Sequence, residues 1–140
     1  MIKLVFFKAN HSIWQVGRGD FAKCFFYTIS YRLEPDGWGT KYPLLMGDFY
    51  DGKLENKYVP LLRKEVEEVR EKLKAFSPDL VVYNFDDPSE PPIWGVDISD
   101  EITDLSNYFV TSDGRDTFDV LFRCIDRCIE YGYDIEIVSR

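Results

Sequence analysis

The sequence predicts a single α+β domain with helices packed on a mixed or antiparallel sheet. Short apolar runs near both ends of the chain have the length of strands. Between them, longer stretches repeat apolar residues every three or four positions, as helices do. No linker or internal repeat divides residues 1–140, and a chain of 140 residues is long enough to bury the core of one domain.

The first third of the chain predicts a hairpin followed by a helix. Residues 2–7 are a short apolar run, and after a turn residues 12–16 alternate weakly, as the second strand of a hairpin would. A helix over 21–33 follows, with Asp20 as its expected N-cap. Turn-forming residues at 34–39 end this helix.

The middle of the chain predicts two more helices and a buried strand. A short helix is expected over 42–50, and the clearest element is an amphipathic helix over 58–76. The apolar residues of this helix are Leu62, Val66, Val69, Leu73 and Phe76. Residues 80–85 then form an apolar run that predicts a buried strand.

The last third predicts a short element at 101–107, a strand at 108–111, a helix and a closing strand. The helix carries one apolar face, and Gly132 is its expected end. Residues 133–138 alternate as the closing strand would. The apolar face of the helix consists of Phe118, Leu121, Phe122, Ile125 and Ile129.

The negative charge of the chain is concentrated in its last sixty residues. The formal net charge is −8, yet residues 1–40 hold 5 basic and 3 acidic side chains, whereas residues 81–140 hold 4 basic and 14 acidic ones. Between positions 86 and 104 there is no Lys or Arg at all. The acidic side chains of this stretch are Asp86, Asp87, Glu90, Asp97, Asp100, Glu101 and Asp104.

Composition excludes several classes of protein. A chain that is 45% hydrophobic and 16% aromatic has too many core-forming residues to be disordered. A pI of about 4.6 argues against a basic nucleic-acid-binding face. No apolar run approaches the roughly 18–20 residues of a membrane span, and the first residues are too quickly charged for a secretory signal, so we expect a cytoplasmic protein without a membrane partner.

The cysteines and the single histidine offer little chemistry. Cys24, Cys124 and Cys128 are an odd number, and we expect them in or beside the core, not in disulfides or a metal site. His11 falls in a predicted turn, and no phosphate-binding glycine pattern is present. We therefore expect no cofactor and no metal.

The acidic stretch supports three interpretations. Trp94 lies within it and Pro88, Pro91 and Pro92 stiffen it into an extended segment, as suits a surface that binds a basic protein. Alternatively, Asp86 and Asp87 form the carboxylate pair of a small hydrolase or ligand-binding domain, which a deep pocket with raised pKa values would favour. In the third interpretation the charge confers only solubility, and the chain assembles through exposed aromatic residues, so its oligomeric state is open.

Three segments together resemble the Immunity protein 70 family. They are residues 34–43 (EPDGWGTKYP), residues 91–95 (PPIWG) and residues 98–121 (ISDEITDLSNYFVTSDGRDTFDVL). The resemblance spans almost the whole chain, and the last segment is the most specific. Trp38, between two glycines, fits a tight turn with a core tryptophan as well as it fits a contact residue.

The resemblance implies a role but no catalytic residues. Members of the family are bacterial proteins predicted to neutralise the toxin encoded beside them in polymorphic toxin systems. The implied function is therefore that of a non-enzymatic inhibitor that binds a cognate toxin domain. A basic nuclease is a toxin that would complement the acidic charge of this chain. Together with the charge pattern, this predicts a partner-binding surface formed by Asp86, Asp87, Glu90, Trp94, Asp97, Asp100, Glu101 and Asp104.

Overall fold

A tight hairpin opens the fold. In the computed structural model, which describes residues 3–140, β1 (Leu4–Ala9) pairs antiparallel with β2 (Ser12–Arg18). Asn10 forms the turn with a positive φ of 57°, a conformation that asparagine tolerates better than most residues. The hairpin confirms the sequence prediction, although Ile2, where the first strand was expected to begin, lies outside the described residues.

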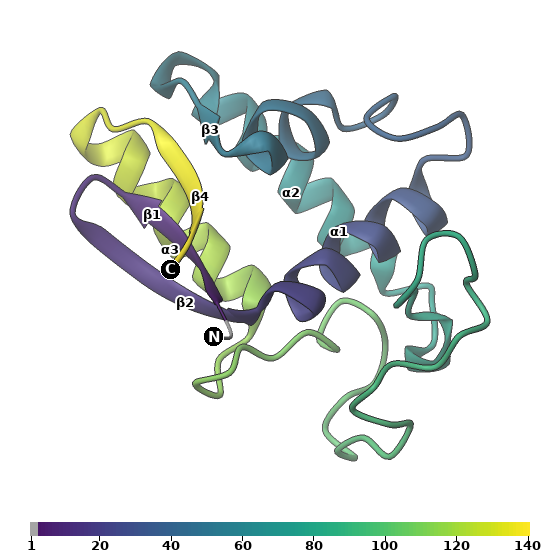
Figure 1. Cartoon of the computed structure of the whole chain (residues 1–140). Coiled ribbons are helices and arrows are strands. Elements are labelled where there is room, and N and C mark those ends of the chain that lie inside the picture. The colour runs from purple at the N-terminus through teal and green to yellow at the C-terminus, as the bar shows by residue number, and fades with distance from the viewer. Residues whose placement is uncertain (1–2) are drawn as a thin grey trace.

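The hairpin belongs to a four-stranded antiparallel sheet with the strand order β2-β1-β4-β3. The closing strand β4 (Ile135–Ser139) pairs with β1 and brings the end of the chain beside its beginning (Figure 1). The second edge strand, β3 (Lys53–Leu54), has only two residues, too few to leave a pattern in the sequence, and was not predicted. With its helices, this sheet confirms the α+β class.

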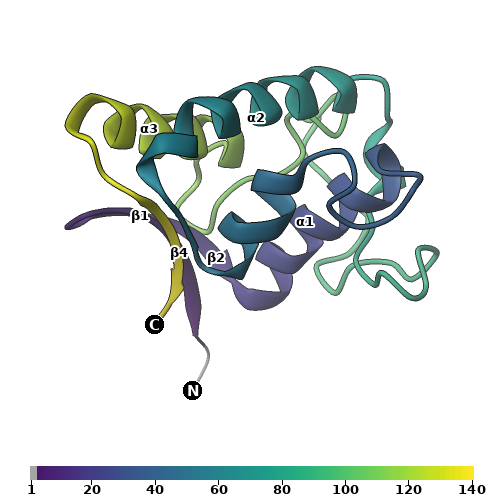
Figure 2. The same ribbon diagram turned by 90° about the horizontal axis from the view of Figure 1, so that it is seen from above.

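Three helices lie together on one side of the sheet (Figure 2). They are α1 (Gly19–Leu33), α2 (Val59–Leu73) and α3 (Thr117–Tyr131). The apolar stripes expected from the sequence face the core that the helices and the sheet share, where burial of apolar side chains stabilises the fold. Ile129, which was expected on the apolar face of α3, is the exception and is 41% exposed. The largest fully buried side chains there include Phe7, Phe25, Phe26, Phe49, Phe109 and Phe118, and the three cysteines are buried with them.

Short helices connect the main elements. The helix expected at 42–50 is a π-helix over Leu44–Phe49, and 3₁₀ turns at Asn56–Tyr58 and Pro78–Leu80 flank α2. The last helix ends as predicted, because Gly132 adopts φ 74° and closes the C-terminus of α3.

The predicted N-cap of α1 is wrong. The helix begins at Gly19, so Arg18 takes the cap position, and no side chain caps the helix there. Asp20 lies one position inside the first turn, where its carboxylate accepts the N–H of Phe21 at 2.9 Å and faces Arg18 at 3.5 Å. A negative charge in the first turn still stabilises the N-terminus of the helix. The aspartate therefore indicated the start of the helix correctly to within one or two residues.

The strand predicted at 80–85 is also wrong. After the 3₁₀ turn the chain runs as coil over the side of α1, although Val81 and Val82 are buried. Thr28 of α1 accepts the N–H of Val82 at 2.9 Å, and Arg32 donates to the carbonyl of Leu80 at 2.9 Å. Side chains of a helix thus satisfy the backbone groups that a neighbouring strand would otherwise bind.

The elements expected at 101–107 and 108–111 are turns and a single β-bridge. Val110 pairs with Asp116 in an isolated bridge, and the carbonyl of Phe109 accepts the N–H of Thr117 at 2.9 Å. These bonds lead directly into α3, so the chain between α2 and α3 contains no strand beyond the bridge. Tyr108, Phe109 and Thr111 are buried, with Phe109 packed against Phe21 and Phe25 of α1, whereas Val110 is exposed.

Candidate partner-binding site

A long irregular connection between α2 and α3 carries most of the predicted site residues. We call residues 86–104 the acidic loop; it lies in the connection that projects away from the sheet in Figure 1. The prediction that the prolines make this loop extended is wrong. The loop forms a series of turns, such as the one from Pro92 to Gly95, where Gly95 adopts φ 88°. Buried Pro92 and, just beyond the loop, buried Leu105 anchor it to the domain.

The acidic side chains of this loop have no basic partners. Among residues 3–140, none of the seven lies within 4.0 Å of a Lys or Arg nitrogen, and six of them are exposed. Acidic residues later in the chain are mostly paired, as Asp126 is with Arg63 at 2.8 Å and Asp119 with Arg70 at 3.0 Å. The unpaired negative charge of the last sixty residues is therefore concentrated in the acidic loop.

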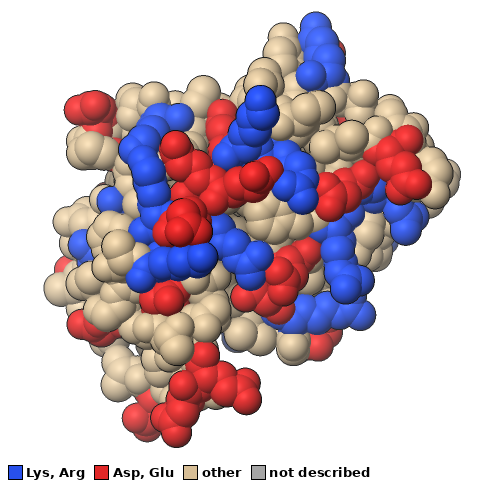
Figure 3. Space-filling model, turned by 180° about the vertical axis from the view of Figure 1, so that it is seen from behind, with Lys and Arg blue, Asp and Glu red and all other residues tan. Residues whose placement is uncertain are grey.

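The molecular surface shows the same contrast. On the face seen in Figure 3, basic and acidic side chains alternate over most of the surface. The projection at the lower end of the molecule, where Figure 1 places the loop between α2 and α3, carries acidic side chains without basic ones beside them. A basic partner would meet an unbalanced negative field in this region of that face.

Asp104 differs from the other acidic residues of the loop. Partial burial raises the pKa of its carboxyl, but hydrogen bonds from Ser106 and Thr103, with the charge of Lys74, outweigh this effect and lower the pKa. One oxygen, Oδ1, accepts both the hydroxyl and the N–H of Ser106. Asp104 is thus held by its own turn and is less available to a partner than the six exposed acids.

The Asp86 and Asp87 pair lacks the surroundings of a catalytic site. Both side chains are exposed, and neither lines the two pockets beside the acidic loop. Asp87 accepts the N–H and the hydroxyl of Ser89 at 3.2 and 2.6 Å, which is the role of an aspartate that stabilises a turn. The structure therefore gives no support to a hydrolase that uses these two carboxylates.

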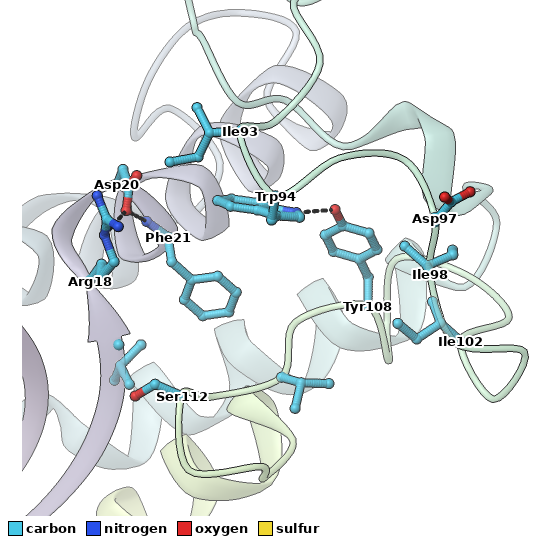
Figure 4. Close-up of a pocket in the computed structure, with 13 residues that line it drawn as sticks. Arg18, Asp20, Phe21, Ile93, Trp94, Asp97, Ile98, Ile102, Tyr108 and Ser112 are labelled. Atoms are coloured by element: carbon cyan, nitrogen blue, oxygen red, sulfur yellow. Dashed lines mark hydrogen bonds and ion pairs between the residues drawn. The ribbon is translucent and has the colours of Figure 1, made fainter.

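A pocket of about 600 Å³ opens beside Trp94, and we call it the Trp94 pocket. The end of β2, the start of α1 and the connection between α2 and α3 form its walls (Figure 4). Arg18 and Asp20 lie at one side of the opening and Asp97 at the other, so the pocket has charged edges and an apolar interior. Its apolar walls include Phe21, Trp94, Ile98, Ile102, Tyr108 and Val110.

Trp94 is held firmly in the wall of this pocket. Its indole N–H donates to the hydroxyl of Tyr108 at 2.8 Å, and its ring packs edge-on against Phe21 and Tyr83, with centroids 5.9 and 5.4 Å away. Burial raises the pKa of Tyr108, so this hydroxyl keeps its proton at neutral pH. Trp94 is nevertheless 39% exposed, and it lines the pocket.

The structure brings together only some of the predicted site residues. Trp94 and Asp97 share the Trp94 pocket, and Glu90 lines a neighbouring pocket of about 410 Å³. Sequence reasoning missed the apolar walls, because Phe21 and Tyr108 carry only the pattern of core residues. Trp38 is half-buried and donates to the carbonyl of Met46 at 2.7 Å, which supports its turn and core role.

The described residues contain neither a metal-binding cluster nor a membrane-spanning helix. Within residues 3–140, no three His, Cys, Asp or Glu side chains are placed to bind a metal ion. None of the helices in that part of the chain has both the length and the apolar character needed to cross a bilayer. The acidic loop and the Trp94 pocket are accordingly the features that a function must explain.

Comparison with known proteins gives one match. The family model described as Immunity protein 70 matches residues 7–137, which include both the acidic loop and the walls of the Trp94 pocket. No curated protein and no solved structure matches the chain.

Proposed function

The chain belongs to the Immunity protein 70 family, and from this premise we propose that it binds a cognate bacterial toxin domain in the cytoplasm and neutralises it without catalysing a reaction. Membership implies an immunity protein. The mode of action follows from the surface: a stoichiometric inhibitor needs an exposed, complementary face and no reactive centre.

The observation that carries the proposal is the unpaired charge of the acidic loop. Six of its carboxylates are exposed and have no Lys or Arg nitrogen within 4.0 Å among residues 3–140. They create a local negative field, which speeds encounter with a basic partner. A nuclease is the toxin that this field fits best, because a surface that binds nucleic acid is basic. The carboxylates would occupy the positions that phosphate groups take on such a toxin.

The decisive test is co-expression with the toxin domain encoded by the neighbouring open reading frame. We expect the chain to restore growth and to co-purify with the toxin. In a purified assay, toxin activity should reach its minimum at about one chain per toxin domain, because an inhibitor acts by occupancy. Protection far below equal amounts would indicate an enzyme instead.

A double variant further distinguishes a stoichiometric inhibitor from a hydrolase. Asp86→Asn with Asp87→Asn leaves the side-chain volumes almost unchanged, and we expect it to keep the one-to-one end point while associating somewhat more slowly. A hydrolase that used this pair would lose its protection completely. Absence of both growth rescue and co-purification for the unmodified chain would contradict the immunity role.

A further inference from the structure

We propose that the Trp94 pocket receives a large apolar side chain from the toxin, presented on a segment that carries Lys or Arg beside it. This inference rests on the proposed function. In this assignment Trp94 forms a wall of the pocket and does not insert into the partner.

The contacts of Trp94 fix it in that role. A tryptophan that inserts into a partner must leave its own surface, but here the indole N–H is bound to Tyr108 and the ring is packed against Phe21 and Tyr83. Tyr108 is itself only 7% exposed, so the hydrogen bond is anchored in the core. Such a fixed wall costs little conformational entropy when a ligand binds, because it is already ordered.

The opening of the pocket exposes apolar surface that a partner would cover. Ile93 is 63% exposed, Val110 43% and Ile98 38%, and all three line the same pocket. Isolated apolar residues on a surface are ordinary, but several around one cavity mark an interaction site. A desolvated pocket of this kind typically contributes a large share of the binding energy of an interface.

The charges around the opening select a basic segment. Arg18 is the basic residue of the lining, and Asp20 neutralises it at 3.5 Å. Asp97 at the other side of the opening is exposed and has no ion pair within the described part of the chain, and the rest of the acidic loop adds charge of the same sign. In a segment with an apolar side chain flanked by Lys or Arg, the apolar side chain would fill the cavity and the basic side chain would pair with the acidic edge.

The test fills the pocket with a larger side chain and measures binding to the toxin domain of the neighbouring reading frame. Val110→Trp and Ile98→Trp start from exposed walls on different parts of the connection. We expect each to raise the Kd at least about tenfold, mostly through faster dissociation. Ile129→Trp on α3, where Ile129 is 41% exposed and outside the pocket, is the matched control and should change the Kd less than about twofold.

Thermal unfolding establishes that each variant is folded, and hydrogen exchange on the unmodified chain gives an independent measurement. Toxin binding should slow amide exchange in residues 93–110. Folded Val110→Trp and Ile98→Trp chains with unchanged affinity, or absence of that protection, would overturn the pocket assignment and leave the immunity role intact. An unmodified chain that does not bind the toxin domain would overturn both.

Two other occupants are distinguished by the same variants. If the chain forms a dimer that Val110→Trp dissociates in analytical ultracentrifugation, the pocket binds a second copy. If native mass spectrometry finds a small molecule on the purified chain that Val110→Trp excludes, the pocket binds that molecule. Either result would overturn the assignment to a toxin side chain.

Discussion

At the scale of single residues, a buried carboxylate holds together the first segment that resembles the immunity family. Glu34 is only 4% exposed, and its two oxygens accept three backbone N–H groups. One oxygen accepts from Gly39 at 2.9 Å, and the other accepts from Lys41 at 3.1 Å and Tyr42 at 2.9 Å. The segment 34–43 therefore folds around its own glutamate, which gives a structural reason for this sequence.

A second carboxylate continues the same support on α2. Glu65 accepts the N–H groups of Leu44 and Leu45, with one oxygen 3.2 and 2.9 Å from the two nitrogens. Burial raises the pKa of Glu65, although these two bonds lower it in part. A neutral side chain with one acceptor oxygen can therefore replace Glu65. At Glu34, both side-chain oxygens must accept hydrogen bonds.

These two residues give a matched pair of substitutions. We expect Glu34→Gln to lower the free energy of unfolding by about 1–3 kcal/mol, because its amide NH₂ would face backbone donors and leave them unsatisfied. Glu65→Gln should cost clearly less, since one carbonyl oxygen can keep both bonds. Urea denaturation measures both values, and equal costs would contradict this account of the two sites.

At the scale of elements, the path of residues 80–85 is set by α1. Thr28 is completely buried, and its hydroxyl accepts the N–H of Val82 at 2.9 Å and donates to its carbonyl at 3.5 Å. One side chain thus supplies both bonds that a strand would take from a neighbour. The contact fixes the start of the connection that carries the acidic loop.

Removing this hydroxyl should loosen the connection. Thr28→Val keeps the shape of the side chain but leaves Val82 without its partners, so we expect a loss of about 1–3 kcal/mol in the free energy of unfolding. Amide exchange in residues 80–85 should become faster, as measured by mass spectrometry. Thr28→Ser retains the hydroxyl and is the control; equally fast exchange in both variants would point to packing instead.

At the scale of the whole molecule, the charges separate into a paired and an unpaired part. Arg63 and Arg70 of α2 hold Asp126 and Asp119 of α3, and they also lie over the ring of Phe122 at 5.0 and 5.9 Å. Exposed pairs of this kind contribute little stability each, but they cancel the charge of α3. The acidic loop, by contrast, has seven carboxylates and no Lys or Arg of its own, and its charge acts outward over about one Debye length, near 8 Å at physiological salt.

Reversal of this charge should slow encounter with the toxin. The test is a triple variant that changes Asp97, Asp100 and Glu101 to Lys. It should lower the association rate constant about tenfold or more at low salt and weaken the dependence of this rate constant on ionic strength. Asp104 is left unchanged because it holds its own turn. Stopped-flow measurements at several salt concentrations give both quantities.

The control is a triple reversal of equal net charge at exposed acids outside the loop. Asp48, Glu55 and Glu130 meet this requirement and have no ion pair among the described residues. If both triple variants slowed association equally, net charge alone would steer the encounter and the acidic loop would not be the binding surface.

The sequence by itself determined the class of fold, the three main helices, the hairpin and the family. Each of these depends on local patterns: the apolar stripe of α2, the glycine that ends α3, and the extended match over residues 7–137. The sequence also placed the charge, because a run without Lys or Arg is visible in one dimension.

Only the tertiary structure decided whether the apolar side chains of the segment 80–110 form strands or pack elsewhere. Val82 and Phe109 have strand-like neighbours in the sequence. Val82 nevertheless bonds to the side chain of Thr28 on α1, and Phe109 bonds beside the isolated bridge that precedes α3. The Trp94 pocket likewise joins Phe21 to Tyr108 across most of the chain. Such contacts depend on which surfaces meet after folding, and no local pattern records that choice.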